Sequence, residues 1–269
     1  MTTTKLPVWA TVRATYRSVK EHSEALAVLS RGTATAAAVA VGLSFGAVQL
    51  LLADERRGSE FLELPAGERV AAYTSLATLV ILFGLFVIIV RWHRMIVQGV
   101  PPGATRPRAT RAAMLYFARS LLLGMIGVAV GLVCGMLPVA LSRSLPIPDD
   151  IGRWLTVASI AGGVLAALLT VGRLSLILPA GAVGDYHVTM RRAWQLSRGN
   201  SWRILAGSLL ASGPVFVANI VLNGLIDALP SMSASVPSLL AMLTLSLLLF
   251  VVTAVVQASF LSYAYKHLA

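Results

Sequence analysis

Charged residues are scarce in this chain, and that scarcity excludes most soluble folds. Aspartate, glutamate, lysine and arginine make up 12 % of the 269 residues, while hydrophobic residues make up 57 %. A soluble domain carries about 25 % charged residues. The core of a soluble protein of this length cannot hold such an apolar excess, so most of the chain is predicted to lie in lipid.

Residues that carry chemistry are also scarce. Cys134 is the one cysteine, which excludes an intramolecular disulfide and a thiolate metal site. The sequence has no HExxH pair, Walker loop, nucleophile elbow or dinucleotide fingerprint. Asp185 and His187 could together contact a metal, but separate interfacial roles are expected for the histidines. We therefore expect no enzymatic activity, no cofactor and no metal site.

Six apolar segments are long enough to cross a bilayer. About 20 apolar residues in a helix span a hydrocarbon core about 30 Å thick. The segments are 33–53, 71–91, 120–141, 155–178, 203–227 and 238–262. Runs such as LATLVILFGLFVIIV do not alternate in polarity as β-barrel strands do. The predicted fold is therefore all-α: one integral membrane domain, 1–269, forming a transmembrane bundle of six helices.

Most of the 22 basic residues lie in alternate connecting segments. The basic segments are 1–32, 92–119 and 179–202, and the intervening ones are 54–70, 142–154 and 228–237. This positive-inside pattern predicts that both chain ends are cytoplasmic, N-in and C-in. The preference for arginine over lysine and the high alanine content suggest a GC-rich bacterium. The predicted location is accordingly a bacterial inner (plasma) membrane.

The net charge of +11 could indicate nucleic-acid binding. We reject that interpretation because the charges are divided among several loops on one face of the membrane. Anionic lipid headgroups explain them better, since each basic residue near such a surface contributes about 1 kcal/mol. The predicted partners are the bilayer and its anionic headgroups, with a homo-oligomer or a membrane-protein partner left open. The candidate lipid contacts are Arg191, Arg192, Arg198 and Arg203.

The three basic segments resemble one another. TVRATYRSVK, TRAAMLYFAR and TMRRAWQLSR each begin with threonine, carry an aromatic residue and have a basic residue nine positions on. Aromatic rings favour the headgroup region, and basic residues on the opposite face meet anionic lipid. The pattern predicts three amphipathic helices on the cytoplasmic side, each followed by a two-helix hairpin.

Polar residues inside the apolar segments are the remaining site candidates, because lipid makes their burial costly. Helical spacing places two stripes, one on each of the last two segments: Ser208, Ser212, Asn219, Asn223 and Asp227, and Ser246, Thr253 and Gln257. Arg173 lies at the depth of Gln257 and is expected either to bond it or, as we favour, to extend to inner headgroups. The candidate intramembrane polar site is Arg173, Asn219, Asn223, Asp227 and Gln257. The stripes either line a substrate path or bond neighbouring helices, and we favour the second.

Small residues recur at four-residue spacing in the third and fourth segments. The third has Gly127, Gly131 and Gly135, and the fourth has Ala158, Gly162, Ala166 and Thr170. Such ridges let helix backbones approach closely. We expect the third segment to lie at the centre of the bundle, with a partner in the same chain or in another.

The stretch RLSLILPAGAVGDYHVTMRRAWQLSRGNSWRIL, 173–205, resembles a loose bacterial family of inner-membrane proteins. That family comprises YciC-like proteins and the membrane domain beside some glycerophosphodiester phosphodiesterases. The matching residues are Arg173, Pro179, Ala193, Ser197, Gly199, Asn200, Trp202 and Arg203. The phosphodiesterase barrel is absent, so no enzymatic residue carries over. The resemblance implies a multi-pass protein of poorly defined role.

The same motif has a local physical interpretation. Gly199 or Asn200 is expected to end the amphipathic helix in a left-handed conformation, and Asn200 or Ser201 to cap the next helix. Trp202 and Arg203 are expected to anchor that helix at the headgroups. We favour a structural anchor over a ligand site.

The sequence therefore predicts a non-enzymatic, multi-pass membrane protein with a role in lipid or envelope organisation. The alternative is a small transporter or channel subunit with a polar path along segments 203–227 and 238–262. An intramembrane lipid enzyme is a weaker third possibility. Substrate, oligomeric state and physiological role are not specified by the residues.

Overall fold

All elements in the described part of the chain are helices. The computed structural model describes residues 4–29, 31, 66–101, 108–144, 148–228 and 236–269. Its helices are α1 (Val8–Glu21), α3 (Ala66–Gln98), α4 (Arg108–Arg143), α5 (Asp149–Leu174), α6 (Ile177–Val183), α7 (Met190–Leu196), α8 (Ser201–Ala228) and α10 (Val236–Leu268). The predicted first span, 33–53, lies outside these residues.

Among the described residues, five helices are long and apolar enough to cross a membrane. Their apolar stretches are Ile81–Gln98, Arg111–Leu141, Asp150–Val183, Ser201–Leu222 and Leu245–Leu268. They overlap the predicted second to sixth spans. The prediction of an all-α fold is confirmed for the described residues, and these five helices are candidate membrane spans by their length and composition. The fourth stretch, predicted as one span ending at 178, contains two helices, because α5 ends at Leu174 and α6 begins at Ile177.

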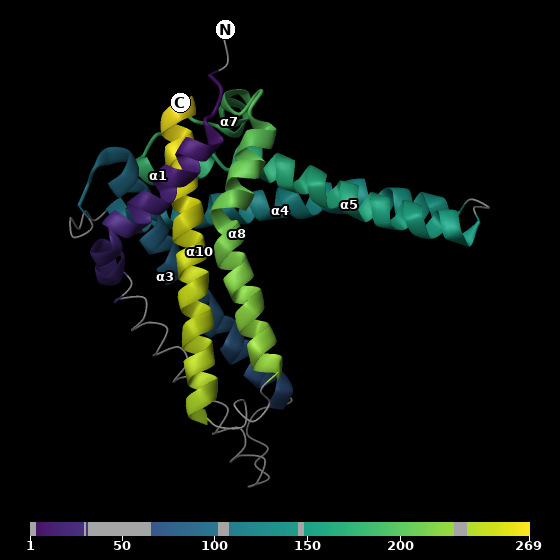
Figure 1. Cartoon of the computed structure of the whole chain (residues 1–269), viewed down its shortest axis with the longest axis horizontal. Coiled ribbons are helices and arrows are strands. Elements are labelled where there is room, and N and C mark those ends of the chain that lie inside the picture. Colours follow the sequence, from purple (N-terminus) through teal and green to yellow (C-terminus); the bar gives the residue numbers. More distant parts are fainter. Residues whose placement is uncertain (1–3, 30, 32–65, 102–107, 145–147, 229–235) are drawn as a thin grey trace.

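The long helices divide into a bundle and an arm. In the bundle α3, α8 and α10 run alongside one another, and α10 is central because it packs against α1, α3, α6 and α8 (Figure 1). The arm is the α4–α5 hairpin, which extends sideways from one end of the bundle. The prediction that the third segment lies at the bundle centre is therefore wrong, since α4 packs mainly against α5.

The arm is held together by direct backbone contact at glycines. A Cβ atom on Gly163 of α5 would lie 2.7 Å from the carbonyl oxygen of Gly131 and 2.7 Å from the Cα of Gly135 in α4. The predicted ridge on α4 is therefore used, and its partner is in the same chain. On α5 the contact residue is Gly163 and not the predicted Gly162, whose Cβ position faces open space. Because neighbouring positions of a helix point about 100° apart, only one of these two adjacent glycines faces α4.

Adjacent glycines on α5 provide a matched pair for testing this contact. Gly163→Ala is expected to destabilise the protein by about 1–3 kcal/mol, because its new methyl group would overlap backbone atoms of α4. Gly162→Ala is expected to be neutral or stabilising by up to about 1 kcal/mol through better helix propensity. Unfolding titrations in mixed micelles measure both. Equal shifts for the two variants would contradict the assigned interface.

The predicted amphipathic helices take three different forms. α1 is a separate helix of 14 residues, as predicted. The second is continuous with the span that follows it in α4, because no glycine or proline interrupts residues 108–123. The third, α7, has seven residues. The prediction of a separate amphipathic helix is therefore wrong for the second region, and all three regions lie at the same end of the bundle.

Candidate functional site

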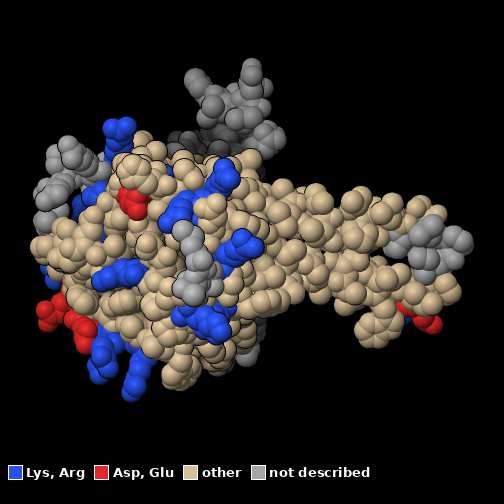
Figure 2. Space-filling view, turned by 90° about the horizontal axis from the view of Figure 1, so that it is seen from above, with Lys and Arg blue, Asp and Glu red and all other residues tan. Residues whose placement is uncertain are grey.

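The candidate site is the end of the bundle where α1, α6 and α7 gather. Seen from above, lysine and arginine residues surround this end, whereas the arm is free of them until its tip (Figure 2). Both chain ends meet here, since His267 Nε2 lies 3.2 Å from the carbonyl oxygen of Lys5. The exposed basic residues of this end include Arg13, Arg17, Lys20, Arg111, Arg191, Arg192, Arg198 and Lys266.

The short helix α6 is buried at the junction between the bundle and the arm. Its carbonyl groups are bonded by side chains from α3 and α4: Arg94 Nε donates to Ala182 over 2.7 Å, and Arg119 Nη1 donates to Ile177 over 3.2 Å. A side chain at Gly181 would collide with the Arg119 guanidinium. These two bonds hold α6 against α3 and α4.

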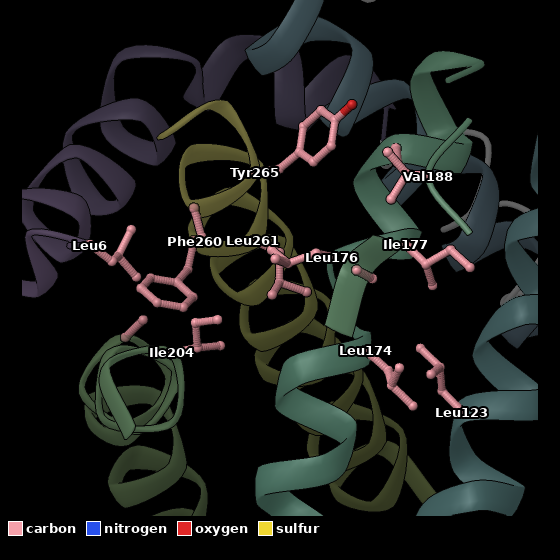
Figure 3. Packing of buried hydrophobic residues seen from close by; sticks show 14 of the residues in the cluster. Leu6, Leu123, Leu174, Leu176, Ile177, Val188, Ile204, Phe260, Leu261 and Tyr265 are labelled. Carbon is pink, nitrogen blue, oxygen red and sulfur yellow. The ribbon is translucent and has the colours of Figure 1, made fainter. Parts of the chain in front are cut away.

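A strap formed by residues 4–7 crosses the start of α8. The Asn200 side chain, 1 % exposed, accepts a bond from the Leu6 N–H at 2.8 Å and donates to the Thr4 carbonyl at 2.9 Å. Arg203 Nη1 donates to the Leu6 carbonyl at 3.0 Å. Figure 3 shows the buried Leu6 side chain beside Phe260, with Ile204 on the other side of that ring. The motif residues thus fix the N-terminal segment to α8.

This geometry corrects part of the local interpretation of the motif. Gly199 adopts φ 79°, the left-handed conformation that was predicted. The Asn200 side chain does not cap α8 but binds the strap, because both of its polar atoms are already bonded to strap backbone groups. Trp202 is 62 % exposed, and Arg203 bonds the strap.

Arg173 joins the end of α5 to α7. Its Nε donates to the Ser197 hydroxyl at 3.3 Å and its Nη2 to the Trp194 carbonyl at 3.0 Å. The guanidinium carbon lies 3.5 Å from the centre of the Trp194 ring, which is cation–π geometry. The pairing of Arg173 with Gln257 is not formed. The start of α7 is itself capped, since Thr189 accepts from the Arg192 N–H at 3.3 Å.

The structure brings together only part of the two polar stripes. Gln257 Nε2 donates to the Ser208 hydroxyl at 3.0 Å, which joins α10 to α8. The Oε1 atom of Gln257 is buried and has no partner among the described residues. Asn219 is half-buried on α8. The side chains of Asn223 and Asp227 lie outside the described residues.

A buried polar network that the sequence analysis missed joins α3, α4 and α10. Trp92 Nε1 donates to Ser259 at 2.6 Å. His93, which is fully buried, contacts Ser262 through Nδ1 at 2.6 Å and Tyr116 through Nε2 at 3.2 Å. Because the Ser262 hydroxyl donates to a carbonyl of its own helix, we assign the histidine proton to Nδ1. Both ring nitrogens are bonded, so this histidine stabilises packing.

Metal binding finds no support in the described residues, where no group of three histidine, cysteine, aspartate or glutamate residues could hold an ion. Asp185, one of the two residues considered for a metal, accepts the Tyr265 hydroxyl at 2.6 Å and the His187 N–H at 3.1 Å. Its carboxylate therefore joins the loop after α6 to α10.

Comparison of the chain with protein-family models, with curated proteins and with solved structures finds no match. The resemblance of residues 173–205 to a bacterial inner-membrane family therefore stays a prediction.

Release of the strap tests the role given to Asn200. Asn200→Ala is expected to leave the Leu6 N–H and Thr4 carbonyl unbonded, at a cost of about 1–3 kcal/mol for a buried group. The variant is expected to show faster hydrogen exchange at the Leu6 amide and faster proteolysis of the N-terminal segment. Both are measured on the protein in detergent. Arg198→Ala, at an exposed neighbouring position, is the control. Unchanged exchange at Leu6 in the Asn200 variant would show that the strap is held by other contacts.

Proposed function

We propose that this chain is a non-enzymatic protein of a bacterial inner membrane, whose basic end binds anionic lipid headgroups and acts in lipid or envelope organisation. The observation that carries the proposal is a set of exposed arginines on and beside α7. Arg191, Arg192 and Arg198 are exposed, and among the described residues none of them forms an ion pair. Their charges are available to an anion outside the protein.

The rigidity of α7 supports this proposal. Arg173 bonds α7 from the neighbouring helix, and Thr189 caps its first turn. The arginines that α7 carries therefore project from an anchored element and not from a free loop. Anchored charges lose less conformational entropy when they bind a headgroup.

Exposed aromatic residues support a position of these arginines at headgroup depth. Trp9, Trp194 and Trp202 are 71 %, 41 % and 62 % exposed, and all three belong to the basic end. Indole rings concentrate at the boundary between hydrocarbon and water. An arginine beside them meets lipid phosphates. The excess of basic residues on one side supports a cytoplasmic position for this end.

Removal of three charges tests the proposal. A variant with Arg191, Arg192 and Arg198 all changed to Gln loses about 3 kcal/mol of attraction at about 1 kcal/mol per residue, which is about 100-fold in affinity. Native mass spectrometry after exchange into phosphatidylglycerol is expected to show far less retained lipid than in the parent chain. Arg153→Gln, at the tip of the arm, is the control and is expected to retain it. Equal retention in all three proteins would refute the proposal.

The transporter alternative is favoured by one observation. Gln257 Oε1 is buried between two spanning helices, without a partner in the described residues, and so offers an acceptor to water or a solute.

Substitution of this glutamine tests the alternative. If the polar stripes line a path, Gln257→Leu abolishes solute or ion flux in proteoliposomes, and the triple Arg variant does not. If they serve packing, the Leu variant stays folded and keeps its lipid. Replacement of Asn219 and Asn223 by Leu extends the comparison along α8. Flux that persists in all these variants would exclude the path.

A further inference from the structure

The guanidinium group of Arg173 is fixed, yet it has donors to spare. Two of its N–H groups bond Ser197 and Trp194, and its face rests on the Trp194 ring. An arginine side chain carries five N–H donors, so three remain outside these bonds. Because the side chain is half-buried, part of the group reaches the surface. The fold thus holds an arginine fork in place before any ligand arrives.

A second arginine stands beside the first. Arg198, which follows α7, is the residue directly after Ser197, whose hydroxyl accepts from Arg173 Nε at 3.3 Å. In the described part of the chain neither guanidinium forms an ion pair with a carboxylate. Two like charges held near each other cost electrostatic energy, and an anion between them offsets that cost. The anion that suits two guanidinium groups has several oxygens and a full negative charge.

We propose that Arg173 and Arg198 together bind one phosphate group of an anionic lipid, with the Trp194 ring supporting the Arg173 guanidinium. This inference rests on the proposed lipid association and gives it a defined position and stoichiometry. The depth is appropriate, because Arg173 occupies the last turn of α5, near the end of the membrane-length apolar stretch Asp150–Val183, and Trp194 is exposed. The phosphate oxygens accept from the free Arg173 donors on one side and from Arg198 on the other.

The proposed two-arginine site and a diffuse basic surface predict different contributions of individual arginines to lipid affinity. On a diffuse surface, Arg191 and Arg198 contribute alike, because both are exposed and carry the same charge. In the two-arginine site, Arg198 contacts the phosphate and Arg191 does not. Arg173→Lys provides a further contrast, since lysine keeps the charge but loses the planar fork and the stacking.

The experiment compares Arg198→Gln with its matched control Arg191→Gln, both in the full chain. Titration with phosphatidylglycerol, followed by native mass spectrometry, gives the affinity of the first bound lipid. Arg198→Gln is expected to weaken it by about tenfold or more, as for loss of a charged hydrogen bond. Arg191→Gln is expected to weaken it by about fivefold or less, as for loss of one surface charge. Arg173→Lys, with its fold verified by thermal unfolding, is expected to resemble Arg198→Gln.

The outcomes separate the site from the broader function. Equal weakening by Arg198→Gln and Arg191→Gln overturns the site but leaves lipid association standing. No preference of the parent chain for phosphatidylglycerol over phosphatidylcholine overturns both. A competition arm with inorganic phosphate identifies the source of the anion. Binding of inorganic phosphate without retention of phosphatidylglycerol would overturn the lipid assignment, while retention of lipid at millimolar phosphate supports it.

Discussion

The constraint on which the basic end depends is the bonding of backbone carbonyls that lie outside the long helices. A spanning helix satisfies its own peptide groups, but the short helix α6 and the strap of residues 4–7 leave groups that lipid cannot bond. Side chains provide the partners. Arg94 and Arg119 bond α6, and Asn200 and Arg203 bond the strap. Segments distant in the sequence are joined in this way at one end of the bundle, and the position of α7 follows from that junction.

The cations of this end consequently fall into two groups that look the same in sequence. Arg119 and Arg203 are half-buried and bond main-chain carbonyls. Arg191 and Arg198 are exposed and have no carboxylate partner in the described structure. Arg173 belongs to both groups, since it bonds α7 with part of its guanidinium and keeps other donors free. The number of basic residues predicts which end of the bundle faces the cytoplasm. Only the exposed arginines of that end are available to bind a ligand.

The long apolar helices were predictable because their apolar residues form continuous runs in the sequence. The left-handed conformation of Gly199 was predictable because local backbone conformation follows from local sequence. Hydrogen-bond partners that are distant in the sequence were not predictable. Asn200 bonds a residue 194 positions away, and nothing near either residue specifies the other. The choice of Gly163 over Gly162 depends on the direction from which α4 approaches, and both positions are glycine. Hydropathy also carries no information on the direction in which a helix leaves a bundle, so the departure of α4 and α5 was missed.

The sideways arm has a mechanical consequence for any bilayer that holds this protein. A flat bilayer has one perpendicular direction, and the bundle and the arm of this structure do not share it. In this structure the two parts therefore cannot both stand perpendicular to one flat bilayer, although α4 and α5 are each long and apolar enough to cross it. The outward surface of the arm is apolar along its length, with Met125, Leu132 and Val157 more than half exposed. Lipid that covers the apolar surfaces of both the bundle and the arm must therefore depart from a flat sheet around the molecule.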